Sequence, residues 1–417
     1  MIVDLPKTTS VAVSKKLVSL RNDVGAMTLG RVLTLVIVVE DTQAEDVIEA
    51  ANDASRQHPC RILVVVAGNR RGANRMDAQI RVGGDAGASE VVVLRLYGPL
   101  ANHGQSVVVP LLLPDSPVVA WWPHEAPADL RKDPIAVMAH RRITDAAESS
   151  NPKAALKRQA RTFSPGDTDL AWTRVTLWRG LLAAALDGPP YLPVTEAVVE
   201  GAVDSPSSDL LAAWLGSTLR VPVQRVRTRA GSGVVGVRLE RSNGPIDLVR
   251  PDGTVATLSQ PGQPDRRISL KRRGLAECLA DELRRLDNDE VYAETLVTGL
   301  ELLTPATKTA SEAAAAGEAP SVEEARRTQR RLARDHHAAA ASAMVTAPTA
   351  PETGDTDQVR TATAAKLADE PTPREQDLGA LAAPAKRTAK RTATPKASTK
   401  AAATRTTAKR TAKKATS

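Results

Sequence analysis

Four short apolar runs in the first third of the chain constrain its fold more than any other feature. They occupy residues 31–39, 62–67, 90–96 and 117–122. Apolar residues follow one another in these runs without alternating with polar ones, so each run predicts a strand that is buried on both faces. Segments of helical length, 42–56 and 99–112, separate the runs within each pair. Parallel strands need such crossovers, so we predict a mostly parallel α/β sandwich as the N-terminal domain, residues 1–165.

The next part of the chain has a different pattern. An amphipathic helix is predicted over 169–187, a strand over 194–199, a helix over 206–219 and a strand over 221–229. Four short strand-like segments then follow at 234–241, 246–250, 254–258 and 267–270, separated by Gly, Asn-Gly and Asp-Gly turns. With two closing helices at about 273–286 and 289–303, the pattern predicts a C-terminal α+β domain with an antiparallel meander, residues 166–303.

Composition changes abruptly after Leu303. All aromatic residues, five Trp, three Tyr and one Phe, lie before this point, and residues 304–417 are rich in Ala, Thr, Pro and charged residues. Such a segment buries too little apolar area to offset ordering, so we predict a disordered low-complexity tail in which one short basic helix fits at 321–340. Residues 384–417 carry 11 Lys or Arg and 0 Asp or Glu. This end therefore suits weak, nonspecific binding of nucleic acid or another polyanion, or serves only to solubilise the chain.

Two adjacent tryptophans, Trp121 and Trp122, end the fourth apolar run. Neighbours on a strand point to opposite faces of the sheet, so the two rings cannot enter the same core. They fall at the carboxyl end of a predicted parallel strand, where open α/β sheets place ligands. Trp172 and Trp178 lie about 120° apart around the next helix. Each ring taken singly fits a core, but we expect part of the set to be exposed as partner anchors.

Four arginines accompany these rings: Arg141, Arg142, Arg174 and Arg179. They fit a surface that receives acidic groups of a protein or the phosphate of a sugar, and they equally fit ordinary ion pairs on a helix face.

Motifs of enzyme chemistry are missing or out of place. Residues 231–236 spell the dinucleotide fingerprint G-x-G-x-x-G, but they lie between two strand-like segments, which predicts a hairpin loop. Cys60 and Cys278 are too few for a metal site and indicate a reducing compartment, with Cys60 packed at the start of a buried strand. We expect no catalytic residues, cofactor or metal. No apolar run is long enough to span a membrane and no export signal is recognisable, so a cytoplasmic location is expected.

Five segments carry a resemblance to a known family. They are Arg31-Val-Leu-Thr-Leu-Val, Ser55-Arg-Gln-His-Pro-Cys-Arg-Ile62, Leu112-Leu-Pro-Asp-Ser-Pro-Val-Val-Ala-Trp-Trp122, Arg141-Arg-Ile-Thr-Asp145 and Asp169-Leu-Ala-Trp-Thr-Arg-Val-Thr-Leu-Trp-Arg179. In this order they closely resemble the glucose-6-phosphate dehydrogenase assembly proteins (OpcA) of actinobacteria and cyanobacteria, over roughly residues 1–303.

The resemblance implies a non-catalytic protein that binds glucose-6-phosphate dehydrogenase, promotes its active oligomer and supports NADPH supply in the oxidative pentose phosphate pathway. The motif positions that it carries over as partner-binding are Pro114, Asp115, Pro117, Trp121, Trp122, Asp145, Trp172, Arg174, Trp178 and Arg179. Two readings of other classes stay open: a sugar-phosphate-binding enzyme or sensor that uses the tryptophan edge, and a nucleoid-associated protein that acts through the basic tail.

Overall fold

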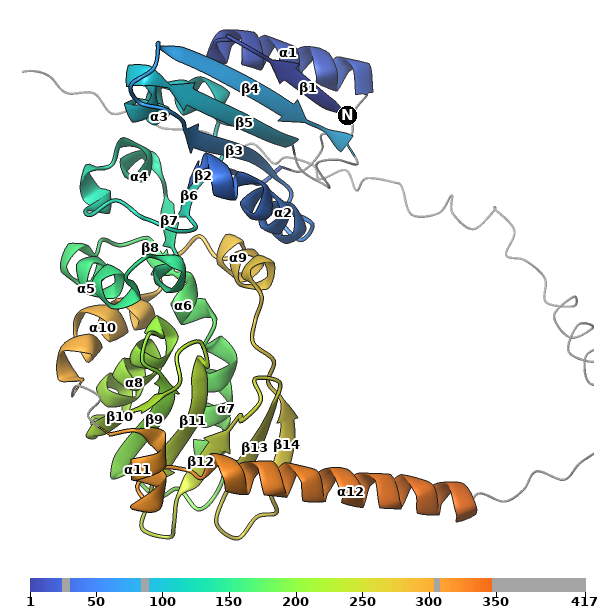
Figure 1. Ribbon diagram of the computed structural model, residues 1–417, viewed down its shortest axis with the longest axis vertical. Coiled ribbons are helices and arrows are strands. Elements are labelled where there is room, and N and C mark those ends of the chain that lie inside the picture. The colour runs from blue at the N-terminus through green and yellow to red at the C-terminus, as the bar shows by residue number, and fades with distance from the viewer. Residues whose placement is uncertain (25–30, 84–89, 304–307, 347–417) are drawn as a thin grey trace, which may run out of the picture. The chain divides into compact units, whose positions relative to one another are not determined.

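The computed structural model describes residues 1–24, 31–83, 90–303 and 308–346. It is a mixed α/β protein with two sheets, the first rich in parallel strands and the second mostly antiparallel (Figure 1). Within the described residues the first sheet has eight strands, which in spatial order are β1 (Ile2–Leu5), β4 (Arg75–Arg81), β5 (Glu90–Tyr97), β3 (Cys60–Ala67), β2 (Leu33–Glu40), β6 (Val118–Trp122), β7 (Arg141–Thr144) and β8 (Asp167–Asp169). The four predicted apolar strands are confirmed as β2, β3, β5 and β6, which pair in parallel.

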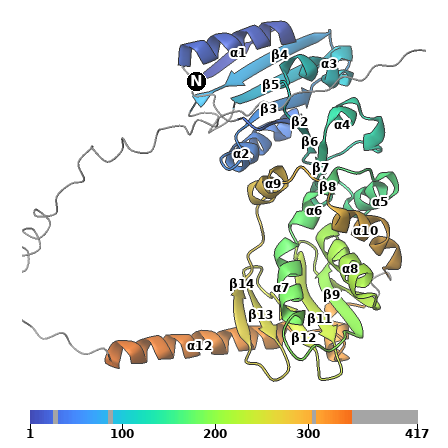
Figure 2. The same cartoon turned by 180° about the vertical axis from the view of Figure 1, so that it is seen from behind.

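Helices cover both faces of this sheet and explain why its central strands are continuously apolar. One face packs against α2 (Ala44–Ser55) and α9 (Leu275–Leu283), which lie beside each other in both cartoon views (Figure 1 and Figure 2). The other packs against α1 (Ser10–Val24), α3 (Gly104–Val108) and α4 (Pro134–Met138). The side chains of Cys60 and Cys278 are both buried in the first of these cores, and burial raises the pKa of Cys278 to about 11.

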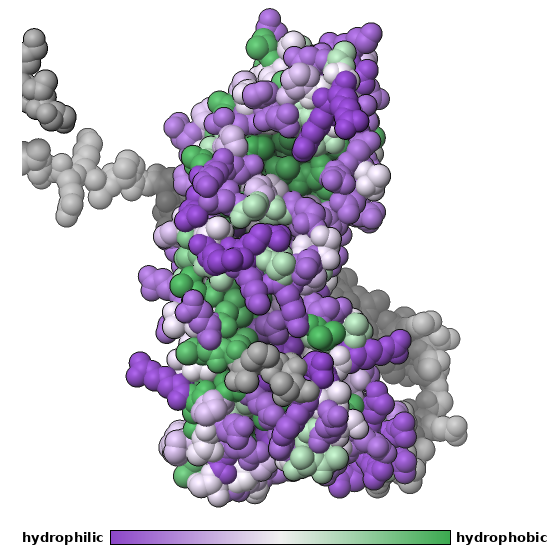
Figure 3. All heavy atoms as spheres, turned by 60° about the vertical axis from the view of Figure 1, so that its left-hand side comes forward, coloured by the Kyte–Doolittle hydropathy of each residue, from purple (hydrophilic) through white to green (hydrophobic). Residues whose placement is uncertain are grey.

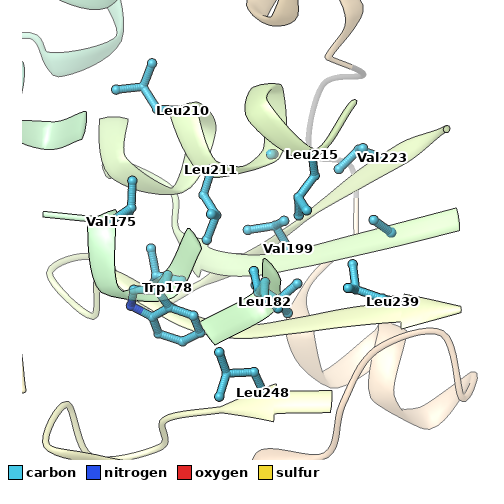
Figure 4. Packing of buried hydrophobic residues seen from close by; sticks show 14 of the residues in the cluster. Val175, Trp178, Leu182, Val199, Leu210, Leu211, Leu215, Val223, Leu239 and Leu248 are labelled. Carbon is cyan, nitrogen blue, oxygen red and sulfur yellow. The ribbon is translucent and has the colours of Figure 1, made fainter. Parts of the chain in front are cut away.

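The second sheet has the strand order β10 (Val223–Thr228), β9 (Glu196–Ala202), β11 (Val234–Glu240), β12 (Ile246–Val249), β13 (Val255–Ser259), β14 (Arg266–Ser269). The predicted antiparallel meander is confirmed from β11 to β14, while β10 pairs in parallel with β9. One face of the sheet buries a core beneath α7 (Thr176–Leu186), α8 (Pro206–Leu219) and α10 (Glu290–Val297). Trp178 and Leu182 of α7 point into this core (Figure 4).

The opposite face of the second sheet is covered by a segment that was expected to be disordered. Here α11 (Ala310–Ala315) and the loop after it pack Ala313 and Ala319 on Val198 and Val226. Farther along, α12 (Val322–Thr346) crosses the sheet, where Gln329 Nε2 donates to the Val255 carbonyl at 2.9 Å. Helix α12 lies where the basic helix was expected, at about 321–340, whereas α11 and the packing of residues 308–320 on the sheet were not expected from the predicted disordered tail. The basic end, 384–417, lies outside the described residues.

A buried carboxyl group lies beneath this segment. Glu200 of β9 is fully buried, and neither of its carboxylate oxygens has a hydrogen-bond partner among the described residues. A Cβ atom at Gly236 would come within 3.1 Å of Pro320 Cγ and 3.2 Å of Glu200 Oε2, so both groups approach the strand closely at this glycine. The pKa of Glu200 is raised to about 8, mainly by burial and to a smaller extent by the charge of Asp247, although Arg238 lowers it.

Several predicted elements differ from the structure. The helix expected over 99–112 is divided into 3-10 turns at Gly98–Asn102 and Val109–Leu111 around the short α3, because His103 leaves the helical region and Pro110 cannot donate. The helix expected over 169–187 is interrupted at Val175 (φ −97°, ψ 6°) and forms α6 (Leu170–Thr173) and α7. Strands β1, β4, β7 and β8 and helix α5 (Pro152–Thr162) were not predicted.

The predicted division at 165/166 cuts across shared structure. Strand β8 pairs with β7 in the first sheet, and α9, far along the chain, completes a core of that sheet. Both elements had been assigned to the second domain. Residues 1–346 form one compact unit by their contacts.

Candidate functional site at the carboxyl edge of the first sheet

The strand order marks one edge of the first sheet as the functional candidate. Its six parallel strands lie in the order β5-β3-β2-β6-β7-β8. Numbered by their own succession along the chain, this is 3-2-1-4-5-6, the order of doubly wound dinucleotide-binding sheets. Such sheets bind ligands outside the carboxyl ends of their strands, where the order reverses, and this point falls between β2 and β6.

A groove of about 430 Å³, lined by both apolar and polar side chains, opens at this point. Its lining includes Trp122 at the end of β6, His103 before α3, and Arg70 after β3. The turn after β2, however, reads Glu40-Asp41-Thr42-Gln43 and forms a 3-10 turn. Nucleotide-binding sheets place glycines and free backbone N–H groups here to hold phosphate, whereas two carboxylates repel it.

Asp169, the last residue of β8, organises the neighbouring part of the edge. Its Oδ2 accepts bonds from Thr144 Oγ1 at 2.7 Å, the Ala146 amide at 2.9 Å and Gln159 Nε2 at 2.8 Å. Its Oδ1 accepts from the Ala171 amide at 2.9 Å and so caps α6. The fully buried carboxylate is held by these donors and joins the ends of β7 and β8 to the helix that follows.

Asp145 and Arg174, two positions carried over from the family, form a bidentate ion pair at this edge. Arg174 Nη1 and Nη2 donate to Asp145 Oδ1 and Oδ2 at 2.6 and 2.7 Å. Asp145 is 1% exposed, and burial raises the pKa of its carboxyl to about 6 although Arg174 lowers it. The two parallel bonds fasten the end of α6 to the residue that follows β7.

A second buried pair links β7 to α9. Arg141 Nη2 donates to Glu282 Oε2 at 2.7 Å, Arg141 Nη1 donates to the Asp287 carbonyl at 2.6 Å, and Thr173 Oγ1 donates to Glu282 Oε1 at 2.5 Å. Burial is the main cause that raises the pKa of Glu282. One carboxylate of α9 thus holds both the first sheet and α6.

The other arginines and Trp172 also have partners inside the chain. Trp172 Nε1 donates to Asp289 Oδ2 at 2.8 Å, and the Arg179 guanidinium lies 3.5 Å from the centre of the Trp172 ring. Arg142 pairs with Asp167 and donates to the Ala139 carbonyl at 3.0 Å. Arg141, Arg142 and Arg174 thus form ion pairs within the chain. Arg179 forms no ion pair among the described residues and lies against the Trp172 ring.

The expectation that some tryptophans are exposed as anchors is wrong. Trp121, Trp122, Trp172 and Trp178 are each at most 1% exposed. Trp121 and Trp122 do point to opposite faces of the sheet, as predicted, but each face has its own cover: α2 and α9 over Trp121, α3 and α4 over Trp122. Trp178 lies in the core of the second sheet.

The proline loop lies apart from the other predicted residues. Pro114, Asp115 and Pro117 precede β6, at the amino edge of the sheet, whereas Trp122, Asp145 and Asp169 end their strands at the carboxyl edge. Pro114 and Asp115 are exposed, and Asp115 adopts a left-handed conformation (φ 53°) that Asp tolerates. The structure thus brings together Asp145, Arg174, Trp172 and Arg179 with Arg141 nearby, but not the proline loop.

Four residues of this network were missed: Gln159, Asp169, Glu282 and Asp289. Asp169 and Asp289 stand directly before helices, where an N-cap signal was available, and both do cap. Gln159 and Glu282 lie within helices, and no local pattern distinguishes them from surface residues.

Two spaces of different size border the network. The cavity beside Thr144, Asp145 and Tyr292 measures about 20 Å³, enough for a water molecule and not for a substrate. An open groove of about 490 Å³ is lined by Arg141, Trp172, Arg179, Glu282 and Asp289. The carboxylates of Asp145 and Asp169 accept bonds from donors within the chain, so their role here is to position elements.

Two family models match the chain. One, described as the N-terminal domain of the glucose-6-phosphate dehydrogenase subunit, matches residues 51–161, and the other, the C-terminal domain of the same subunit, matches residues 165–296. The chain belongs to the glucose-6-phosphate dehydrogenase assembly protein (OpcA) family. The matched ranges contain both edge networks and most of the second sheet. The resemblance read from five sequence segments is thereby confirmed.

Comparison with curated proteins gave no match. Among solved structures, the 3-ketoreductase KijD10 from Actinomadura kijaniata is similar at a TM-score of 0.36 and 12% identity, covering 65% of this chain and 94% of that one. Glucose-6-phosphate 1-dehydrogenase from Mycobacterium avium is similar at a TM-score of 0.33 and 12% identity, covering 64% of this chain and 90% of that one. Similarities at these TM-scores establish neither a shared site nor a shared activity. No helix in the described part of this OpcA-family chain has the length and apolar character of a membrane span.

Proposed function

We propose that this protein is a non-catalytic assembly factor that binds glucose-6-phosphate dehydrogenase and promotes its active oligomer in the cytoplasm. The observation that carries the proposal is the pair of family matches, which together contain β3 to β8 of the first sheet and β9 to β14 of the second. To promote the active oligomer, the protein must bind that form of the dehydrogenase more tightly than the inactive form.

The two halves of the carboxyl edge support a role without catalysis. At the strand-order reversal, Glu40 and Asp41 stand where a phosphate-binding turn would need glycines. At the ends of β7 and β8, the carboxylates of Asp145 and Asp169 accept hydrogen bonds from groups within the chain. A doubly wound sheet that is altered in this way suits a binding partner of an enzyme better than an enzyme.

The contact surface must come from residues that reach solvent. Of the positions carried over, Pro114 and Asp115 are exposed, and Pro117, Arg174 and Arg179 are half-buried. Because Arg174 is held by Asp145, we propose that Pro114, Asp115 and Arg179 touch the dehydrogenase. The buried positions, including the four tryptophans, then act by holding the shape of that surface. On the face shown in Figure 3, apolar side chains form separate patches among charged ones, a mixture found in protein interfaces.

The test mixes the full chain with the dehydrogenase from the same cell. Complex mass is followed by light scattering and NADPH formation by absorbance, with the chain alone under substrate and NADP as control. We expect a complex of defined mass and faster NADPH formation, and no turnover by the chain alone. Absence of both a complex and a rate change would overturn the proposal, while turnover by the chain alone would favour the enzyme reading.

A finer test addresses the proline loop. Asp115→Asn removes one exposed charge and keeps a residue that tolerates the left-handed conformation. We expect several-fold weaker binding of the dehydrogenase, whereas Glu49→Gln, the same change on the exposed side of α2, should bind normally.

A further inference from the structure

A second groove adjoins the carboxyl-edge network at Arg174 and lies between the start of α8, the β10–β11 loop and the segment after β14. It measures about 290 Å³ and its lining includes four arginines: Arg174, Arg250, Arg272 and Arg273. We call it the arginine groove. Nothing in the proposed function uses it.

Two of these arginines are already neutralised. Arg174 pairs with Asp145, and Arg273 pairs with Glu277 at 2.9 Å and Asp281 at 2.6 Å. The other two, Arg250 and Arg272, make no ion pair with any carboxylate among the described residues. The groove therefore holds two guanidinium groups without a paired carboxylate among the described residues. The exposed Asp252 acts on Arg250 through space but does not pair with it.

Arg250 is the more unusual of the two because it is 5% exposed. Its Nη1 and Nη2 donate to the Leu270 and Val234 carbonyls, both at 2.9 Å, and its Nε has no acceptor among the described residues. The guanidinium lies 5.0 Å from the centre of the Trp178 ring. Burial, followed by the nearby Arg272, lowers the pKa of Arg250 to about 10. A buried cation held only by carbonyls and a ring is a site of positive potential that an anion would stabilise.

Neighbouring elements add to this potential. Arg272, an exposed side chain, donates from Nη1 to the Gly231 carbonyl at 2.7 Å and so fixes the Gly-rich loop beside the groove. The N-terminus of α8, a 14-residue helix capped by Ser205, also lines it, and helix N-termini carry partial positive charge. The acids of the lining, Glu148 and Asp204, are exposed, where solvent screens them.

We propose that the arginine groove binds the phosphate group of a small phosphorylated metabolite, with Arg250 and Arg272 as its cationic partners. The charge of two guanidinium groups matches that of a phosphate monoester dianion better than that of a single carboxylate. The volume lies at the lower end of ligand pockets, which fits a ligand of sugar-phosphate size. The letters of residues 231–236 match a dinucleotide motif. Residues 231–233 belong to the loop between β10 and β11 that Arg272 holds, and residues 234–236 begin β11, so the segment borders the proposed anion site without a strand-to-helix turn.

The test is done on the full chain without the dehydrogenase, so that its outcome is independent of the proposed assembly role. Calorimetric titration and thermal unfolding are measured with a hexose 6-phosphate, inorganic phosphate and the unphosphorylated hexose at constant ionic strength. We expect saturable binding and a raised Tm with the hexose phosphate, weaker binding of phosphate, and none of the hexose.

Matched variants locate the site. Arg272→Gln changes an exposed side chain and should weaken hexose phosphate binding at least tenfold. Arg250→Met should abolish binding if it folds. Arg56→Gln removes the same charge from a side chain that is 71% exposed, far from the groove, and should bind like the natural chain. No saturable binding of either phosphate probe, or binding that Arg272→Gln leaves unchanged, would overturn the proposal.

Discussion

At the scale of single residues, Trp121 and Trp122 show that two adjacent large side chains on a strand can both be buried, although the local sequence suggested that one is exposed. Period-two alternation correctly separated Trp121 and Trp122 onto opposite faces. What local sequence could not reveal is that α9, about 150 positions farther along, shares the core in which Trp121 is buried. A ring whose cover comes from a distant segment looks unpartnered until the tertiary structure is known.

The burial of Trp122 gives the first prediction. Trp122→Ala would leave a large cavity beneath α3 and α4, so we expect it to lower the free energy of unfolding by about 3–5 kcal/mol. Chemical denaturation measures the loss. Tyr191→Ala, at a ring that is 78% exposed, is the control and should stay within about 0.5 kcal/mol of the natural chain. A Trp122→Ala variant with unchanged stability would restore the surface role that the sequence first suggested.

Glu200 gives a prediction about pH. Its pKa is raised from 4.5 to about 8, so the folded protein binds a proton there that the unfolded chain releases above pH 4.5. The stabilising contribution of the neutral carboxyl is complete below pH 4.5 and is lost as pH rises through 8. We expect Glu200→Gln to remove this loss and to be more stable than the natural chain at pH 9, by up to roughly 4 kcal/mol.

The pH dependence of Tm for the two proteins tests this. Glu196→Gln, at the exposed start of the same strand, is the matched control and should follow the natural chain. Parallel curves for Glu200→Gln and the natural chain from pH 5 to 9 would show that Glu200 is already charged in the folded protein.

At the scale of elements, the local sequence pattern predicted the strands and helices that carry their own apolar periodicity. It did not predict elements that depend on contacts with distant parts of the chain. The buried strands β2, β3, β5 and β6, the helix α8 and the meander were predicted because each carries its own periodicity. Strand β4 was missed because it is polar on alternate residues, and β7 and β8 because they have only four and three residues. Likewise, Asp145, Trp172 and Arg174 of the edge network were recognised as motif positions, but Glu282, within α9, gave no local signal. The N-cap signal of Asp289 predicts the start of α10 but not the bond from Trp172.

Helix α9 gives the element-scale prediction. Glu282→Gln would leave Arg141, 2% exposed, without its carboxylate, so we expect a loss of about 3–5 kcal/mol in the free energy of unfolding. Glu277→Gln on the same helix breaks only a pair whose acid is 58% exposed and should cost about 1 kcal/mol or less. The double variant Arg141→Met with Glu282→Leu should recover much of the loss. Equal effects of Glu282→Gln and Glu277→Gln would mean that the Arg141 pair does not fasten α9.

At the scale of the whole molecule, the structured part is longer than composition indicated. Low aromatic content and abundant alanine after residue 303 predicted disorder, yet small side chains such as Ala313 and Ala319 can pack closely on Val198 and Val226. Composition measures whether a segment can build its own core. It does not measure whether the segment can complete the core of another, and α11 and α12 do the latter.

The last prediction compares two truncations. A chain of residues 1–303 would expose Val198, Val226 and Glu200, so we expect it to be less stable by about 2 kcal/mol near pH 6. This loss of stability should be smaller above pH 8. At that pH the buried Glu200 carboxylate is charged and destabilises the full chain, whereas truncation exposes it to water. A chain of residues 1–346 keeps the whole packed unit and should unfold like the full chain while still binding the dehydrogenase.

The same truncation tests the basic end. If the basic end acts on polyanions, the full chain alone should be retained on DNA, with a strong dependence on salt, because 11 cations release counterions. Equal retention of the full chain and 1–346 would assign polyanion binding to the folded unit, and equal stability of 1–303 and 1–346 would contradict a structural role for α11 and α12.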